Sequence, residues 1–109
     1  MGTIYKVLAQ SNPSANTSTT IYTVPSSTNT VVSTMTICNT SAANVSVNVA
    51  VQPAGGSLTS AMYVINGTNI VSHDTMFLTL GITLAQTDVV SVTANATGVA
   101  FGLFGSEIS

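Results

Sequence analysis

Short runs in which apolar and polar residues alternate are the feature that most constrains how this chain can fold. In the clearest run, residues 45–51, four valines alternate with Ser46, Asn48 and Ala50. Successive side chains of a β-strand point to opposite faces of a sheet, so the run predicts a strand with one buried face. An amphipathic helix would instead repeat its apolar residues every three or four positions.

Similar runs, rich in β-branched and aromatic residues and bounded by Gly, Pro, Asn or Ser, predict further strands. They span residues 3–8, 19–24, 30–38, 61–65, 68–71, 76–82, 89–92 and 99–103. Asn66-Gly67 lies between two of them and predicts a two-residue hairpin turn. In the last third of the chain, residues 76–104, three runs follow one another closely. We interpret them as a three-strand antiparallel meander that forms one wall of the core, with one apolar stripe made of Met76, Leu78, Leu80 and Ile82.

These runs amount to eight or nine strands in a chain of 109 residues, with a turn signal about every ten residues. This spacing is typical of an antiparallel β-sandwich and not of alternating strands and helices. We therefore expect one all-β domain over residues 1–109, a sandwich of the jelly-roll or Greek-key kind with about eight strands.

Charged residues are scarce. Only Lys6, Asp74, Asp88 and Glu107 carry charge, which is 4% of the chain against about 25% in an average domain. Ser, Thr and Asn supply the polarity instead. Net charge keeps protein molecules apart in solution, so a formal net charge of −2 favours a surface that is covered by copies of the chain or by a larger lattice.

The same composition argues against several function classes. Nucleic-acid and anionic-membrane binding each need several basic side chains, and the chain has one. No apolar run reaches the roughly 20 residues that span a bilayer. A single cysteine, Cys38, forms no internal disulfide framework, so we expect assembly in a cytoplasm.

Residue pairs that could carry chemistry are few. Ser72, His73 and Asp74 are consecutive, and neighbours in an extended chain point apart, so a turn explains them better than a catalytic triad. Asp74 and Asp88 could meet across strands, although two carboxylates alone would bind a cation weakly. Cys38 ends an apolar strand and is expected to be a buried small side chain. We expect no catalytic, metal or cofactor site and no enzyme activity.

The aromatic residues are spread along the predicted strands, as core residues usually are: Tyr5, Tyr22, Tyr63, Phe77, Phe101 and Phe104. Phe77 and Phe104 fall on the faces opposite the main apolar stripes of their strands. These two could instead line a subunit contact. Five asparagines begin Asn-x-Ser/Thr triplets, which a chain rich in these residues forms by chance: Asn16, Asn39, Asn44, Asn66 and Asn95.

Four stretches, residues 6–41, 49–58, 73–92 and 101–109, resemble small virion structural proteins of tailed bacteriophages, especially those of cyanobacterial and other aquatic hosts. The resemblance implies a structural component of a virion and brings no catalytic motif. Relatives of this kind often have arginine near the positions of Thr40 and Gln52, so the partner surface of this chain is expected to differ there.

Together these features predict a capsid cement or decoration protein that binds and stabilises the assembled head shell. Its expected partners are the major capsid protein lattice and copies of itself, as a homotrimer, in a virion assembled in the host cytoplasm. The first alternative is a tail, baseplate or fibre-associated module that contacts the host surface. The second is a small carbohydrate-binding or hydrolytic domain, which would need an exposed aromatic or carboxylate cluster.

Overall fold

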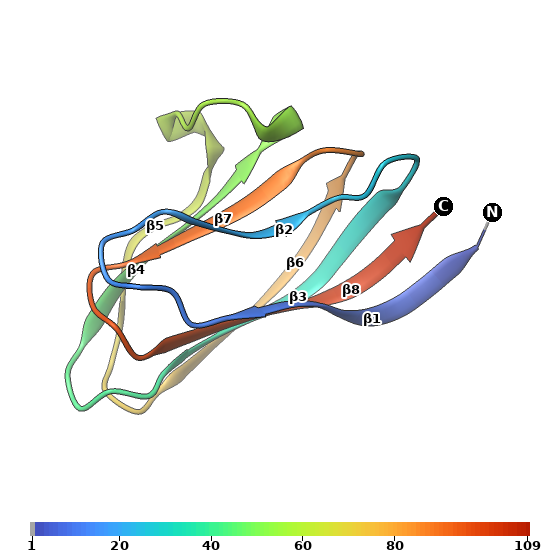
Figure 1. Ribbon diagram of the computed structural model, residues 1–109. Helices are drawn as coiled ribbons and strands as arrows, with labels where there is room; N and C mark the ends of the chain where they lie inside the picture. Colours follow the sequence, from blue (N-terminus) through green and yellow to red (C-terminus); the bar gives the residue numbers. More distant parts are fainter. Residues whose placement is uncertain (1) are drawn as a thin grey trace.

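A computed structural model describes residues 2–109, apart from the side chain of Leu80. Residues 2–109 form eight strands and two short 3₁₀ turns, η1 (Pro53–Gly55) and η2 (Ser60–Met62). Figure 1 shows the strands in two layers. Their bounds are β1 (Thr3–Ser11), β2 (Thr19–Thr23), β3 (Asn29–Asn39), β4 (Val45–Gln52), β5 (Tyr63–Ile70), β6 (Thr75–Leu84), β7 (Val89–Ala94) and β8 (Val99–Ile108).

The strands pair in two antiparallel sheets of four, in the orders β1-β8-β3-β6 and β2-β7-β4-β5. Apart from β4 and β5, consecutive strands lie in opposite sheets, so the chain crosses repeatedly from one layer to the other. This strand order is that of a jelly roll, an eight-stranded sandwich of two Greek keys. The predicted antiparallel β-sandwich is therefore confirmed, in its jelly-roll form.

The predicted meander in the last third of the chain is wrong. β6 pairs with β3, β7 pairs with β2 and β4, and β8 pairs with β1 and β3. Alternation gives each strand one apolar face but does not specify the partner strand. Because two sheets must close over the same core, each of these connections crosses to the other layer.

The hairpin predicted at Asn66-Gly67 is also wrong, since both flanking runs belong to the single strand β5. Asn48 of β4 pairs with Asn66 and Val47 pairs with Thr68, so Gly67 is an extra residue, a β-bulge. Gly67 has a φ of +72°, and its N–H donates to Asn48 Oδ1 at 2.6 Å. Glycine adopts positive φ easily, which suits a bulge as well as a tight turn.

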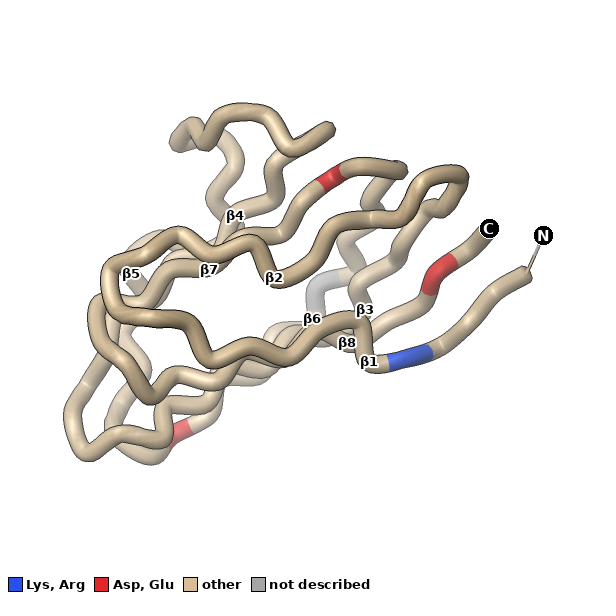
Figure 2. Tube along the Cα trace, in the orientation of Figure 1, with Lys and Arg blue, Asp and Glu red and all other residues tan. Residues whose placement is uncertain are grey.

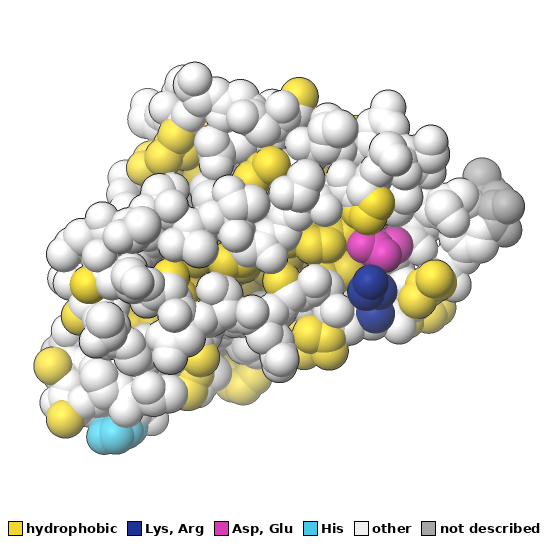
Figure 3. All heavy atoms as spheres, viewed as in Figure 1, with side chains coloured by type: hydrophobic (Ala, Val, Ile, Leu, Met, Phe, Trp, Pro, Cys, Tyr) yellow, Lys and Arg dark blue, Asp and Glu magenta, His cyan; other side chains and the backbone are white. Residues whose placement is uncertain are grey.

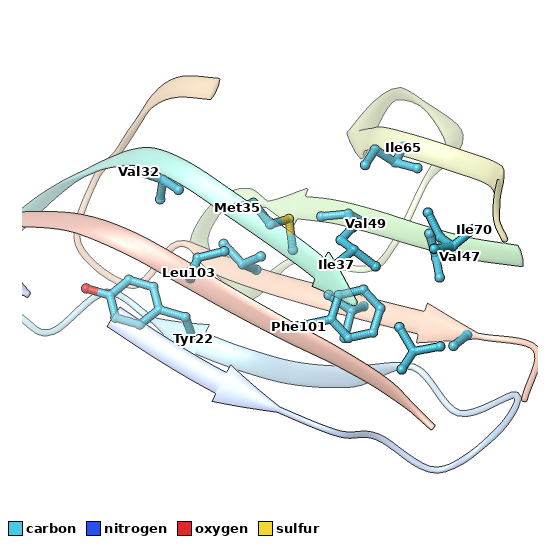
Figure 4. Packing of buried hydrophobic residues seen from close by; sticks show 14 of the residues in the cluster. Tyr22, Val32, Met35, Ile37, Val47, Val49, Ile65, Ile70, Phe101 and Leu103 are labelled. Atoms are coloured by element: carbon cyan, nitrogen blue, oxygen red, sulfur yellow. The ribbon is translucent and has the colours of Figure 1, made fainter. Parts of the chain in front are cut away.

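The core lies between the inner faces of the two sheets, as Figure 4 shows. Val45, Val47 and Val49 of β4 are buried, which confirms the strand read most clearly from the sequence. The opposite sheet contributes the largest buried side chains, among them Met35, Ile37, Phe101, Leu84 and Leu103. In β6, Met76, Leu78 and Ile82 pack against this cluster. Leu80, predicted on the same stripe, lies outside the described side chains.

A buried asparagine closes one end of the sandwich. Asn39, the last residue of β3, is fully buried. Its Nδ2 donates to the carbonyl oxygens of Ala43 at 2.8 Å and Ile70 at 3.0 Å. Its Oδ1 accepts hydrogen bonds from the N–H and the hydroxyl of Ser41, at 3.0 and 2.6 Å. One side chain thus joins β3, the turn after it and the end of β5 in the other sheet.

We expect Asn39→Ala to lower the free energy of unfolding by about 3 kcal/mol, because it leaves buried backbone groups without a partner. Asn44→Ala is a matched control in the same turn. Asn44 is exposed, and its Oδ1 accepts one hydrogen bond, from Ser72 N at 3.1 Å. The control should therefore cost less than about 1 kcal/mol. Urea unfolding followed by circular dichroism measures both, and equal losses would contradict the role given to Asn39.

Candidate interaction surface

The outer face of the β1-β8-β3-β6 sheet carries exposed aromatic residues. Two rows of residues run across the strands on the side away from the core. One row is Val7 of β1, Phe104 of β8 and Thr34 of β3. The other is Gly102 of β8, Thr36 of β3 and Phe77 of β6. Phe77 is 72% exposed and Tyr5 is 84% exposed. We call this surface the aromatic face; its residues are Tyr5, Val7, Thr34, Thr36, Cys38, Phe77, Ala100, Gly102 and Phe104.

Two open hollows lie on either side of the Phe104 ring. One, of about 390 Å³, is lined by Thr36, Cys38, Ala100 and Gly102 among others. The other, of about 580 Å³, lies over Gly105 and Ser106 and is bordered by Tyr5 and Lys6. A Cβ at Gly102 would lie 2.7 Å from Thr36 Oγ1 and 3.0 Å from the Phe104 ring, so glycine keeps the first hollow open. The face therefore offers both projecting rings and depressions that could receive apolar side chains.

The outer face of the other sheet has a different character. Strand pairing places polar side chains there in rows: Ser46, Asn48, Asn66, Asn69, Ser91 and Thr93. Several of them are bonded within the chain. Ser91 Oγ donates to Gln52 Oε1 at 2.7 Å, and Asn48 Oδ1 accepts the bulge N–H of Gly67. Because its polar groups bond one another or face water, this face is a weaker candidate for burial in a protein contact.

The charged residues lie at the ends of the sandwich. Figure 2 shows them as isolated positions along the trace, and Figure 3 shows Lys6 against an acidic side chain with hydrophobic atoms around the pair. That partner is Glu107, whose Oε1 lies 3.3 Å from Lys6 Nζ. Tyr22 OH donates to Glu107 Oε2 at 2.5 Å and lies 2.9 Å from Thr30 Oγ1. This cluster closes the end of the sandwich opposite Asn39.

The cluster shifts two pKa values in opposite directions. Burial, together with the neighbouring Glu107 carboxylate, raises the pKa of the Tyr22 phenol to about 12. The hydrogen bond from Tyr22, followed by that from Lys6, lowers the pKa of Glu107. The phenol is buried, and the carboxylate accepts hydrogen bonds from two donors. The cluster therefore joins the two sheets and has a structural role.

The Ser72-His73-Asp74 sequence forms the turn between β5 and β6. Ser72 Oγ donates to the carbonyl of Ser41 at 2.9 Å, and Asp74 Oδ1 accepts from the N–H of Thr75 at 2.9 Å. His73 is exposed and has a φ of +59°. Among the hydrogen bonds found in residues 2–109, none joins two of these three side chains, so the geometry is that of a turn.

Asp74 and Asp88 do not meet. Asp74 precedes β6 and Asp88 follows it, so the ten residues of β6 separate them by roughly 30 Å. Asp88 instead accepts backbone N–H groups from Ala54 and Ala85, both at 2.9 Å, and so ties η1 to the turn after β6. In the described part of the chain, no three potential metal ligands come together.

Two predictions about single side chains need correction. Cys38 is not buried in the core: it is partly exposed on the aromatic face, because the buried side chains of β3 there are its neighbours Ile37 and Asn39. Tyr5, expected in the core with most aromatics, is exposed, whereas Tyr22 and Phe101 are buried. Phe77 and Phe104 lie on the outer face, as predicted from their position opposite the apolar stripes.

The Tyr22–Glu107 contact and the role of Asn39 were not predicted from the sequence. The Tyr22 and Glu107 side chains come from β2 and β8, which lie in different sheets, so no local pattern joins them. The sequence did contain a signal for Asn39. It is a polar residue at the end of an apolar strand, directly before a turn that begins with Thr40 and Ser41.

No family model matches this chain, and no curated protein matches it. In the residues that the structure describes, no helix has the length and hydropathy to cross a membrane.

The two shifted pKa values predict the pH dependence of stability. The pKa of Glu107 is lowered from its usual value of 4.5 in the folded chain, so its contribution to stability is complete above about pH 4.5 and is lost as the pH falls through the folded-state pKa. The pKa of Tyr22 is raised from 10.0 to about 12, so its contribution is complete below pH 10 and is lost between pH 10 and 12.

Glu107→Gln should therefore flatten the acid side of the stability profile, and Tyr22→Phe should flatten the alkaline side. Urea unfolding at pH values between 2.5 and 12 measures both. Because the chain has only three carboxyl side chains, the acid side is simple to interpret. A Glu107→Gln profile parallel to the wild-type profile below pH 5 would contradict the assignment.

Proposed function

We propose that this chain is a structural protein of a bacteriophage virion that binds the assembled head shell as a cement or decoration protein. The observation that supports the proposal is the aromatic face, a sheet surface that combines exposed Phe77 and Tyr5 with two hollows. Aromatic residues anchor protein interfaces, and the core of an interface is depleted in charge. The outward-pointing residues of this sheet fit both conditions.

The fold and the sequence add independent support. Jelly rolls occur in viral capsid and lectin domains, and a fold by itself does not fix function. The resemblance of four stretches to small phage virion proteins favours the viral use of this fold over the lectin use. The near absence of basic residues fits a partner that is a protein lattice and not the packaged nucleic acid.

Such a protein would act by mass action. It binds the assembled shell and not its dissociated subunits, so each bound copy adds a free energy of RT ln(1 + [L]/Kd) to the assembled state. No chemical step is involved. The aromatic face would bridge neighbouring capsid subunits, and the polar outer face of β2-β7-β4-β5 would remain in water. The protein would assemble onto particles in the host cytoplasm.

One feature favours a second candidate, a tail, baseplate or fibre-associated module. Residues 53–62 between β4 and β5 project from the sandwich, as Figure 1 shows, and carry Leu58 at 40% exposure. A segment that projects from a rigid sandwich can reach a receptor or a neighbouring subunit of a ring, as the tail candidate requires. Copy number separates the two candidates, since a shell protein is abundant and a tail module is present in a few copies.

We expect quantitative mass spectrometry of purified particles to give between one third and one copy of this chain for each major capsid protein. A handful of copies in each particle would support the tail candidate. Absence from the particle would contradict any role in the virion.

Phe77→Ser should weaken binding to emptied shells by about 30-fold, the loss of roughly 2 kcal/mol typical of an anchoring aromatic residue. Val71→Ser is a matched control, because Val71 is 51% exposed and lies in the turn after β5, outside the aromatic face. Shells with wild-type or Val71→Ser protein should also withstand higher temperature than bare shells. Equal binding by both variants would remove the aromatic face from the contact.

A further inference from the structure

β1 is an edge strand with an exposed apolar segment. It is the first strand in the order β1-β8-β3-β6, so only one side of it is paired within the chain. Tyr5 and Val7 point to the outer face and are 84% and 49% exposed. Ile4 points to the opposite, inner face, yet it is 60% exposed. This segment therefore shows apolar side chains on both faces of the sheet.

The hydrogen-bond pattern defines which backbone groups face the open edge. Gly2 N–H donates to Ser109 O, and Ser109 N–H donates to Gly2 O, both at 2.9 Å, so these two residues form a hydrogen-bonded pair. Such pairs alternate in an antiparallel ladder, which assigns Ile4 and Lys6 to β8. The residues whose N–H and C=O groups point to the open edge are then Thr3, Tyr5 and Val7.

A partner that covers the aromatic face would bury Tyr5 and Val7 but leave Ile4 in water. A strand added beside β1 would place its own side chains on both faces of the sheet, next to Ile4 on one face and next to Tyr5 and Val7 on the other. It would also pair with the N–H and C=O groups of Thr3, Tyr5 and Val7, six groups in all. The segment ends at Leu8, where the pairing with β8 shifts register in a bulge. Bulges end regular pairing, so five residues, 3–7, are available to an added strand.

We propose that the occupant of this edge is β1 of a second copy of the chain, antiparallel and related by a two-fold axis at Tyr5. In this register Tyr5 faces Tyr5 of the second copy, and Thr3 faces Val7, which forms three hydrogen-bonded pairs from the six groups on each copy. The Tyr5 rings meet on the outer face, where cross-strand aromatic pairs stabilise a sheet. On the inner face, Ile4 packs against the aliphatic stem of Lys6 of the second copy.

The charges near the edge are compatible with this pair. Lys6 is the one charged residue in the segment, and its ammonium lies against Glu107 of its own chain at 3.3 Å. In the proposed register Lys6 faces Ile4 and not the second Lys6, so no like charges lie directly opposite one another. A formal net charge of only −2 on each copy adds little repulsion at longer range.

This two-fold pair differs from the homotrimer that was expected from the sequence. It concerns purified protein and holds whether or not the chain is part of a virion. Analytical ultracentrifugation of the whole chain should give twice the chain mass of 11.0 kDa, about 22 kDa, in the micromolar range. A monomer at all concentrations, or a trimer, would overturn the proposal.

Tyr5→Pro tests the edge directly. The N–H that it removes points to the open edge and has no backbone partner in the pairing of residues 2–109, and proline is tolerated on the open side of an edge strand. We expect this variant to keep the wild-type circular dichroism and unfolding midpoint but to sediment at about 11 kDa. Phe77→Ser, on the same outer face but at the far edge strand β6, should remain a dimer. The opposite result, a dimeric Tyr5→Pro or a monomeric Phe77→Ser, would overturn the edge pairing.

Amide hydrogen exchange of the wild-type chain, resolved by NMR, gives a test that needs no variant. The amides of Tyr5 and Val7 should gain protection as the protein concentration rises through the dimer dissociation constant. The amides of Ile4 and Lys6, which bond β8, should be protected at every concentration. Unchanged exchange at Tyr5 and Val7 would count against the proposal even if Tyr5→Pro failed to fold.

Discussion

Burial of one apolar face from each strand between the two sheets is the interaction on which the rest of the structure depends. Neither sheet can be stable alone, because a four-stranded layer with an uncovered apolar face would leave its valines and leucines in water. The chain meets this requirement by crossing between layers at almost every turn, so partners such as β1 and β8 lie at opposite ends of the sequence. The core and the strand order therefore depend on each other.

Two polar clusters complete this core at its ends, and both connect the sheets. At one end Asn39 bonds the turn after β3 and the carbonyl of Ile70 in β5. At the other end Tyr22 of β2 reaches Glu107 of β8, which also accepts from Lys6. The one lysine of the chain is thus paired with a carboxylate of its own chain, although its side chain remains 44% exposed. None of the residues that make up the aromatic face is charged.

The local part of this structure could be predicted from the sequence, and the part that depends on distant partners could not. Alternation located β4 and the approximate position of every other strand, because side-chain direction is a local property. It gave no partner for β6, β7 or β8, and the meander was wrong for that reason. Asn66-Gly67 was misread because positive φ serves a bulge and a turn equally. Phe77 was placed correctly on the outer face from its own strand alone, whereas Tyr5 was expected in the core but points to the outer face, away from the opposite sheet.

The edge of β1 and the aromatic face share Tyr5 and Val7, and this links the two proposed contacts. One aromatic face of four strands, about 4.8 Å apart and about 30 Å long, covers roughly 600 Å², less than the ~800 Å² that each partner usually contributes to a stable interface. A two-fold axis perpendicular to the sheet places both faces of the proposed pair on the same side, as one continuous eight-stranded surface. The doubled surface exceeds that threshold, and two identical faces held together bind a repeating lattice with an effective concentration that a single copy lacks. Edge pairing would in this way turn a face that binds the lattice weakly into one that binds it tightly, without any additional charge.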